Sequence, residues 1–340
     1  MASVYLVSAA LEDSDRFPAF ALDDLERIKR SAERDKHGVH KLTDDPETAD
    51  LILFVERAHA TGRYMEAIRR HPLLKKYRDK CFIYNSRYFG VPFLPGVYGC
   101  VRKRDFLYPQ RMCSGHYLEV CERDELEYQE PLPNPPYLYS FVGAVNTWPS
   151  VRAPLSRLSH PRGYFVDTSE ERKRLEAEGV HADKTWYTQR YVDVVRKSKF
   201  VLCPRGDAVG SMRLFESMKM GRAPVIIADQ WVNPRGPDWE SFSIRIREKD
   251  IPTIPRVLEE MEDRALEMGI VARKVWEEWF SEEVSFHWAV EWCLEIMEKR
   301  KVPESIMRFA VPLGLLMPFH LRRYLGTRVH LYKTQGKLIL

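Results

Sequence analysis

The residues best suited to chemistry lie in one stretch, residues 198–229, which reads SKFVLCPRGDAVGSMRLFESMKMGRAPVIIAD. The apolar run 200–203 predicts a strand, and a glycine-containing loop then leads into a helix expected to start at Ser211. The first turn of a helix presents free N–H groups, so it favours anions, and a diphosphate suits such a position. We therefore expect a phosphate-binding site where this strand passes into this helix.

Four further residues extend the predicted site. Arg205 and Arg213 can each offer paired N–H donors to a phosphate group. Gly206 allows the backbone to approach a ligand closely. Glu216 follows Arg213 by one short turn, shares its helix face and can accept hydrogen bonds from ribose hydroxyls. The alternative is that the arginines only form ion pairs and the glycines only turn the chain, since the segment holds neither a Walker A loop nor GxGxxG.

The same segment resembles the signature of the exostosin family, which is glycosyltransferase family 47. The matching stretches are CPRG at 203–206, SMRLFE at 211–216, Gly221, PVI at 224–226 and Asp229. Looser likenesses occur at residues 239–243 and 248–252, in the first part of the chain at residues 43–51, and at residues 139–143. The resemblance is specific over residues 198–252 and loose over the rest of residues 1–300.

The resemblance implies an inverting glycosyltransferase with a GT-B fold and, as is usual in the family, a UDP-sugar donor. By that match Arg205, Gly206, Ser211 and Arg213 bind the diphosphate and Glu216 binds the ribose. The turn after Gly143 adds two donor-site candidates. They are Asn146 and Arg152, which lie where GT-B donor domains approach phosphates.

The expected reaction is transfer of a hexosyl or pentosyl group from a nucleotide-sugar to an oligosaccharide or lipid-linked glycan in cell-surface polysaccharide synthesis. We expect a minimal, bacterial-type member without the membrane anchor and second catalytic module of animal exostosins, so the family does not identify the acceptor. One alternative is a non-catalytic exostosin-like scaffold that partners another glycosyltransferase. A scaffold would be free to lose Arg205, Ser211, Arg213 and Glu216, which are all present. A sugar phosphorylase is a third reading, but no lysine-bearing cofactor site supports it.

A metal is not expected in the reaction. Asp13-Ser14-Asp15 is a DxD sequence, the motif that holds a divalent metal in GT-A enzymes, but it follows the first predicted strand too early to serve a nucleotide. Acidic residues near the start of a helix are the favoured explanation. A GT-B site can replace the metal with arginines and a helix dipole, so we predict no cofactor besides the donor substrate.

Direct displacement at the sugar needs a general base for the acceptor hydroxyl. Glu56 immediately follows the apolar run 51–55, at the carboxyl end of a predicted strand, where ligands of parallel sheets gather. His59 follows in the same loop. His116 and Asp13 are weaker candidates, and an ordinary loop carboxylate remains the alternative for Glu56.

The elements that position these residues alternate between short apolar runs and helical patterns, which predicts parallel sheets covered on both faces. The sequence EPLPNPPY at 130–137 interrupts the alternation, because prolines cannot continue a helix or a central strand. We therefore predict an α/β protein of the GT-B class with two facing Rossmann-like domains. Residues 1–134 form the acceptor-side domain and residues 135–300 the nucleotide-sugar-binding domain, and residues 301–340 form a tail.

Composition supports a folded protein that does not bind nucleic acid. Of the 340 residues, 44% are hydrophobic, and the formal net charge is only +4. The six cysteines form no CxxC pair, so we expect reduced thiols. No signal peptide is evident and no apolar run reaches the roughly 18 residues of a membrane-spanning helix. We expect a cytoplasmic protein, either free or peripheral at the inner face of the membrane.

The tail carries an apolar run at residues 309–316 between basic residues, broken by Pro312 and Gly314. One interpretation is contact with a membrane surface that holds lipid-linked acceptors. The other is that the tail packs back on the N-terminal domain.

Overall fold

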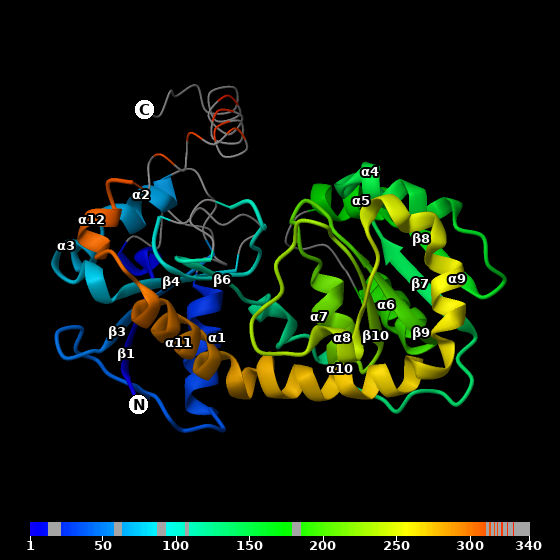
Figure 1. Cartoon of the computed structure of the whole chain (residues 1–340), viewed down its shortest axis with the longest axis horizontal. Helices are drawn as coiled ribbons and strands as arrows, with labels where there is room; N and C mark the ends of the chain where they lie inside the picture. Colours follow the sequence, from blue (N-terminus) through cyan, green and yellow to red (C-terminus); the bar gives the residue numbers. More distant parts are fainter. Residues whose placement is uncertain are drawn as a thin grey trace. The chain divides into compact units, whose positions relative to one another are not determined.

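The computed structural model describes residues 1–12, 22–57, 63–86, 93–105, 109–178 and 185–310, together with single positions up to residue 329. The chain forms two compact units, each with its own sheet (Figure 1). The first unit comprises Met1–Leu118 together with the described residues from Glu282 onward, and the second is Glu119–Ser281.

The first unit contains a parallel sheet with the strand order β2-β1-β3-β4-β5-β6. The strands are β1 (Ser3–Val7), β2 (Lys41–Leu42), β3 (Leu51–Glu56), β4 (Cys81–Asn85), β5 (Gly96–Tyr98) and β6 (Met112–Ser114). Every residue of β3 and β4 is buried, as expected for central parallel strands that are covered on both faces. The helices of this unit are α1 (Asp23–Glu33), α2 (Arg63–Arg70), α3 (Pro72–Lys76), α11 (Glu282–Lys299) and α12 (Glu304–Met307).

The second unit contains a parallel sheet with the strand order β11-β10-β9-β7-β8. The strands are β7 (Tyr137–Gly143), β8 (Gly163–Asp167), β9 (Ser198–Pro204), β10 (Ala223–Ile227) and β11 (Ile244–Arg245). The helices are α4 (Pro149–Arg152), α5 (Ser169–Glu178), α6 (Thr185–Arg196), α7 (Met212–Lys219), α8 (Trp239–Phe242), α9 (Ile254–Glu260) and α10 (Ala265–Trp279). Its core includes Phe200 and Leu202 of β9, which are almost completely buried beside Val225 and Ile227 of β10.

The predicted α/β class with two Rossmann-like parallel sheets, the components of the GT-B fold, is confirmed. The unit boundaries differ from the predicted ones. The second unit begins at Glu119, before the proline-rich linker, because the Lys219 ammonium donates hydrogen bonds to the carbonyls of Val120, Cys121 and Arg123 at 2.9–3.0 Å.

The return to the first unit also occurs earlier than residue 301, because α11 packs beside α1 (Figure 1). Ser31 of α1 receives a 2.8 Å hydrogen bond from the Phe286 N–H, and Glu282 forms ion pairs with Arg30 and Arg34 at 3.0 and 2.8 Å. In the tail, the Glu304 carboxylate pairs with the Arg111 guanidinium, and both side chains are buried. Residues up to Glu304 therefore bind to the first unit.

Two further expectations concern cysteines and membranes. No disulfide joins any of the six cysteines, which all lie in the described part of the chain, and burial raises the pKa of Cys81 and of Cys203 to about 12. Within the described part of the chain, no helix combines the length and apolar character needed to cross a membrane.

Strand order reverses once in each sheet. In the first unit β2 and β3 lie on opposite sides of β1, and in the second β8 and β9 lie on opposite sides of β7. Chain connections leave such a pair of strands in opposite directions, so the carboxyl ends at the switch point stay uncovered and bind ligands. The ends of β1 and β3, and of β7 and β9, are therefore where functional side chains are expected.

Candidate functional site

Arg213 lies across the end of β7, at the switch point of the second unit. Its Nε donates a 2.8 Å hydrogen bond to the Val142 carbonyl, and its guanidinium carbon lies 5.4 Å from the centre of the Phe141 ring. A Cβ atom on Gly143 would come within 2.5 Å of the Arg213 Nη2. The glycine at the end of β7 therefore creates the space in which this guanidinium lies.

Arg152 connects the loops that follow β7 and β9. It is buried, and its guanidinium donates to the carbonyls of Arg205 and Ala144 at 2.8 Å each and of Pro204 at 3.3 Å. A Cβ atom on Gly206 would lie 2.9 Å from its Nη2. Arg152 thus positions the loop after β9, and its charge adds to the positive potential at this end of the sheet.

Arg205 stacks on an aromatic ring that the sequence analysis did not identify. Its guanidinium carbon lies 4.0 Å from the centre of the Trp148 ring, within the range of a cation–π interaction. Its backbone N–H donates a 3.0 Å hydrogen bond to the Ile227 carbonyl, which fixes the loop to the neighbouring strand β10. Trp148 immediately precedes α4, and its position four residues before Arg152 was the only hint in the sequence that an aromatic ring lies near the arginines.

Ser211 is the N-cap of α7, as predicted, but its hydroxyl makes no capping hydrogen bond. The residue has extended backbone angles, is 5% exposed, and its Oγ has no hydrogen-bond partner among the described residues. A buried hydroxyl without a partner costs about 1–3 kcal/mol. An anionic ligand at the start of α7 would satisfy this hydroxyl and would lie at the positive end of the helix.

Glu216 lies one turn further along α7, where its carboxylate is buried and paired with Arg123. Arg123 also binds Glu125 at 2.8 Å. Burial alone would lower the pKa of Arg123, but the two carboxylates outweigh it and raise that pKa. The partner of Glu216 is thus 93 residues away in sequence, and no local pattern could have indicated it.

Asn146 lies in a short 3-10 turn, Val145–Thr147, directly after β7, and its side chain is exposed. The N–H groups of Val145 and Asn146 donate to the Ser169 hydroxyl at 3.0 and 3.2 Å. The Asp167 carboxylate at the end of β8 also accepts from the Val145 N–H at 3.0 Å. These bonds hold the backbone of Asn146 at the edge of the site, and they do not involve its side-chain amide.

The motif ends with an acidic residue, Asp229, which follows the neighbouring strand β10. Asp229, just after β10, accepts a 3.1 Å hydrogen bond from the Glu248 N–H, and its own N–H donates to the Glu248 carboxylate at 3.1 Å. This reciprocal pair fixes the chain after β10 to the segment that follows β11. The hydrogen bonds with Glu248 therefore give Asp229 a structural role.

Glu56 lies at the other switch point, in the first unit. It ends β3, is fully buried, and accepts hydrogen bonds from the Ser8 hydroxyl at 2.9 Å and the Ala9 N–H at 2.8 Å. The predicted partner His59 lies outside the described residues, as do Asp13 and Asp15. The structure thus brings Glu56 to the end of β1, where ligands of this sheet are expected.

His116, the weaker candidate for the base, is a core residue. Its ring nitrogens lie 3.3 Å from the Tyr84 hydroxyl and 3.2 Å from the Ser285 hydroxyl, and burial lowers its pKa to about 3. The ring stays neutral and its hydrogen bonds are internal, so a structural role explains it.

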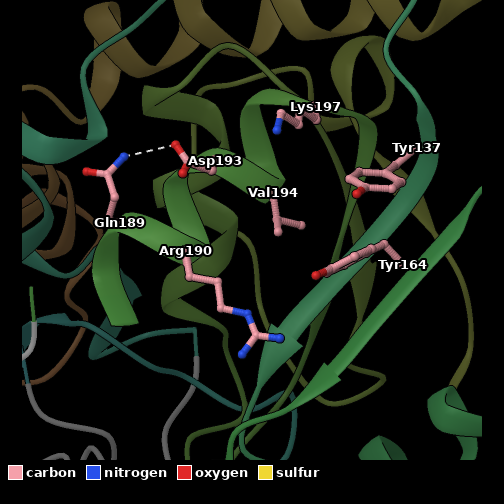
Figure 2. Close-up of a pocket in the computed structure, with 7 residues that line it drawn as sticks. All are labelled: Tyr137, Tyr164, Gln189, Arg190, Asp193, Val194 and Lys197. Carbon is pink, nitrogen blue, oxygen red and sulfur yellow. Dashed lines mark hydrogen bonds between the residues drawn. The ribbon is translucent and has the colours of Figure 1, made fainter. Parts of the chain in front are cut away.

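A cavity of about 480 Å³ in the second unit lies elsewhere, near the amino ends of β7 and β8 (Figure 2). It is lined by Tyr137, Tyr164, Gln189, Arg190, Asp193, Val194 and Lys197. Because ligands of parallel sheets bind at the carboxyl ends of the strands, this cavity is not the expected donor site.

Comparison with known proteins identifies the class of the second unit. Residues 111–261 match the family model described as the Exostosin GT47 domain. The chain is 35% identical over 88 residues to a probable glycosyltransferase of Arabidopsis thaliana, covering 25% of this chain and 19% of that protein. It is 28% identical over 163 residues to Exostosin-2 of Bos taurus, covering 46% of this chain and 23% of that protein.

The predicted resemblance to the exostosin family is thus confirmed over residues 111–261, which match its GT47 domain. The chain spans about a fifth of the length of these two relatives. Among solved structures it is similar to WaaG, a glycosyltransferase involved in lipopolysaccharide biosynthesis, with 15% identity and a TM-score of 0.38 over 84% of this chain and 98% of that chain.

Proposed function

We propose that this protein is an inverting glycosyltransferase that moves a sugar from a nucleotide-sugar, with UDP-sugar as the expected donor, to a glycan acceptor in the synthesis of a cell-surface polysaccharide. The GT47 domain and the relatives named as glycosyltransferases support the reaction class. The observation that carries the proposal is the buried Ser211 hydroxyl without a partner, at the start of α7 and next to the arginine cluster of the switch point.

The arginine cluster suits the leaving group of this reaction. As the bond between the sugar and the diphosphate breaks, negative charge grows on the phosphate oxygens, and fixed cationic donors stabilise it with little reorganisation. Arg213 is held by the Val142 carbonyl and Arg205 by its stacking on Trp148, so both guanidiniums are positioned before the ligand arrives. Glu216 is proposed to hold the ribose, and its pairing with Arg123 orients its carboxylate.

The chemical step is a single displacement. The acceptor oxygen attacks the anomeric carbon, a new glycosidic bond forms, the bond to the diphosphate breaks and the nucleoside diphosphate leaves. The base takes the acceptor proton. We propose Glu56 as this base, because it lies at a switch point and is fixed by Ser8 and Ala9, and His59 as the second candidate.

The proposed donor site needs no metal, because its guanidiniums and the start of α7 provide positive potential at the phosphates. Turnover should therefore persist in EDTA. Activity that disappears in EDTA and returns with Mn²⁺ or Mg²⁺ would overturn this point and would bring Asp13 and Asp15 back into consideration.

The tail supports contact with a membrane that holds a lipid-linked acceptor. Phe309, Leu313 and Leu316 are 70%, 59% and 63% exposed. We expect the chain to sediment with vesicles that contain anionic lipid, because exposed apolar and basic side chains bind such surfaces together. Replacing Phe309 and Leu313 by serine should abolish sedimentation, whereas Leu266→Ser, at a residue 55% exposed in the second unit, should not. Sedimentation that is the same for all three proteins would exclude the tail as the contact.

Arg213→Ala should lower kcat by about a hundredfold or more, as does loss of one donor that stabilises transition-state charge. Lysine at this position should restore only part of the rate, because it lacks the planar pair of donors. UDP binding by calorimetry, initial rates and the melting temperature are measured on the same preparation.

Arg256→Ala is the matched control, since this exposed arginine on α9 forms a 2.8 Å ion pair with Glu260 of the same helix. An Arg213→Ala protein that melts earlier but keeps its kcat would show that Arg213 only supports the loop after β7. A protein that binds no nucleotide-sugar at all would favour the scaffold function.

Glu56→Gln should lower kcat by about a hundredfold or more if Glu56 is the base. Glutamine can still accept from the Ala9 N–H and donate to the Ser8 hydroxyl, so the fold around β1 and β3 should be retained. The exposed Glu47→Gln, which changes the same charge in the same unit, is the control. Unchanged kcat with an unchanged melting temperature would remove Glu56 from the mechanism and leave His59.

A further inference from the structure

Three histidines and a glutamate meet in the first unit, outside the residues that match the exostosin domain. His37 and His40 lie in the segment between α1 and β2, while His287 and Glu291 lie on α11. The last two are four residues apart, so they share one face of the helix. These contacts join segments about 250 residues apart in the sequence.

The ligand atoms of His40, His287 and Glu291 lie within 4.8 Å of one another. The His40 Nε2 is 2.9 Å from the Glu291 Oε1. His40 and His287 are 6% and 7% exposed, and the Nδ1 atom of each is buried without a hydrogen-bond partner. Two buried ring nitrogens without partners, next to a carboxylate, are costly unless a further group binds them.

The chemistry of these three side chains fits a borderline transition metal. Neutral imidazole and carboxylate are ligands of Zn²⁺, whereas Mg²⁺ and Ca²⁺ prefer oxygen ligands alone. The carboxylate of Glu291 is partly exposed and supplies negative charge that offsets the charge of the ion.

We propose that His40, His287 and Glu291 form a Zn²⁺ site that fastens the segment before β2 to α11. Three protein ligands leave the fourth tetrahedral position for water. The ring of His37 stacks on that of His287, with centres 3.8 Å apart and planes at 14°, so it covers the site and does not serve as the fourth ligand. The metal would strengthen a junction already made by the hydrogen bond from the Lys36 N–H to the Glu283 carbonyl at 3.1 Å.

The competing explanation is an apolar and aromatic cluster without a metal. The His287 ring lies edge-on to Trp288 with centres 4.9 Å apart, and the His40 ring edge-on to Phe286 at 6.4 Å. In that case His40 and Glu291 form only a hydrogen bond with each other, and a divalent ion should bind here no better than at another hydrogen-bonded histidine and glutamate, such as His160 and Glu259.

The test uses the full chain, freed of metal with EDTA and dialysed. Zn²⁺ binding is measured by calorimetry, and Co²⁺ replaces Zn²⁺ as a spectroscopic probe because tetrahedral Co²⁺ absorbs visible light strongly. We expect one Zn²⁺ per chain, the visible Co²⁺ spectrum of a tetrahedral site, and a melting temperature that rises with Zn²⁺ but not with Mg²⁺. Loss of one ligand should weaken Zn²⁺ binding at least as much as loss of a supporting residue does, by about tenfold or more.

His287→Gln and Glu291→Gln are the test variants, and His160→Gln is the matched control. His160 also bonds to a glutamate, with its Nε2 2.9 Å from the Glu259 Oε1, but it belongs to no cluster of three ligands among the described residues. If His287→Gln folds poorly, Glu291→Gln still decides, because Glu291 is 41% exposed and its loss leaves the core intact. Equal Zn²⁺ affinity in the wild type and Glu291→Gln, or a Co²⁺ spectrum like that of the free ion, would overturn the proposal.

Failure of this proposal is distinguishable from failure of the glycosyltransferase proposal. The metal is read by calorimetry and absorption without any sugar, and UDP binding to the second unit is measured in EDTA. A chain that binds Zn²⁺ but no nucleotide, or the reverse, separates the two conclusions.

Discussion

The reversal of strand order in each parallel sheet is the constraint on which the rest of this structure depends. At the reversal two neighbouring strands send their chains in opposite directions, and ligands of parallel sheets bind outside the carboxyl ends of such a pair of strands. The second unit places Gly143 and the loop after Pro204 at this position, and the first places Ser8 and Glu56 there. Arg213 and Glu56 therefore lie at the carboxyl ends of the strands, which is the position where parallel sheets bind ligands.

Arginine is suited to this position because one guanidinium can bind the protein and still present donors elsewhere. Arg152 uses its guanidinium on three carbonyls and thereby holds two loops together. Arg213 uses Nε on the Val142 carbonyl, and the missing side chain of Gly143 leaves room for its terminal nitrogens. A lysine in either position would have a single nitrogen for both tasks. Arginine can therefore position a loop with one nitrogen and keep other nitrogens for a ligand, because its guanidinium carries several donors.

The parts of the site that are local in sequence were predictable, and the parts made by distant residues were not. The strand, loop and helix around Arg205, Ser211 and Arg213 appear where the pattern of residues 198–229 placed them, because glycines, the N-cap serine and apolar runs act within a few residues. The pairing of Glu216 with Arg123 spans 93 residues, and that of His40 with Glu291 spans 251. The same reason explains the unit boundaries, since Lys219 draws residues 120–123 to the second unit before the proline-rich linker begins.

The contacts around α7 argue for an anion at the start of this helix independently of the likeness to known proteins. Glu216 is balanced by Arg123, and Asp229 is held by reciprocal hydrogen bonds with Glu248, so the carboxylates near the sheet edge are already engaged. The guanidiniums of Arg152 and Arg213 donate to backbone carbonyls, and that of Arg205 stacks on the Trp148 ring. These contacts fix the three side chains near the start of α7 before any ligand is present. The Ser211 hydroxyl at the same position is buried and has no hydrogen-bond partner among the described residues, so an anion bound there would give it the hydrogen bond that the helix does not provide.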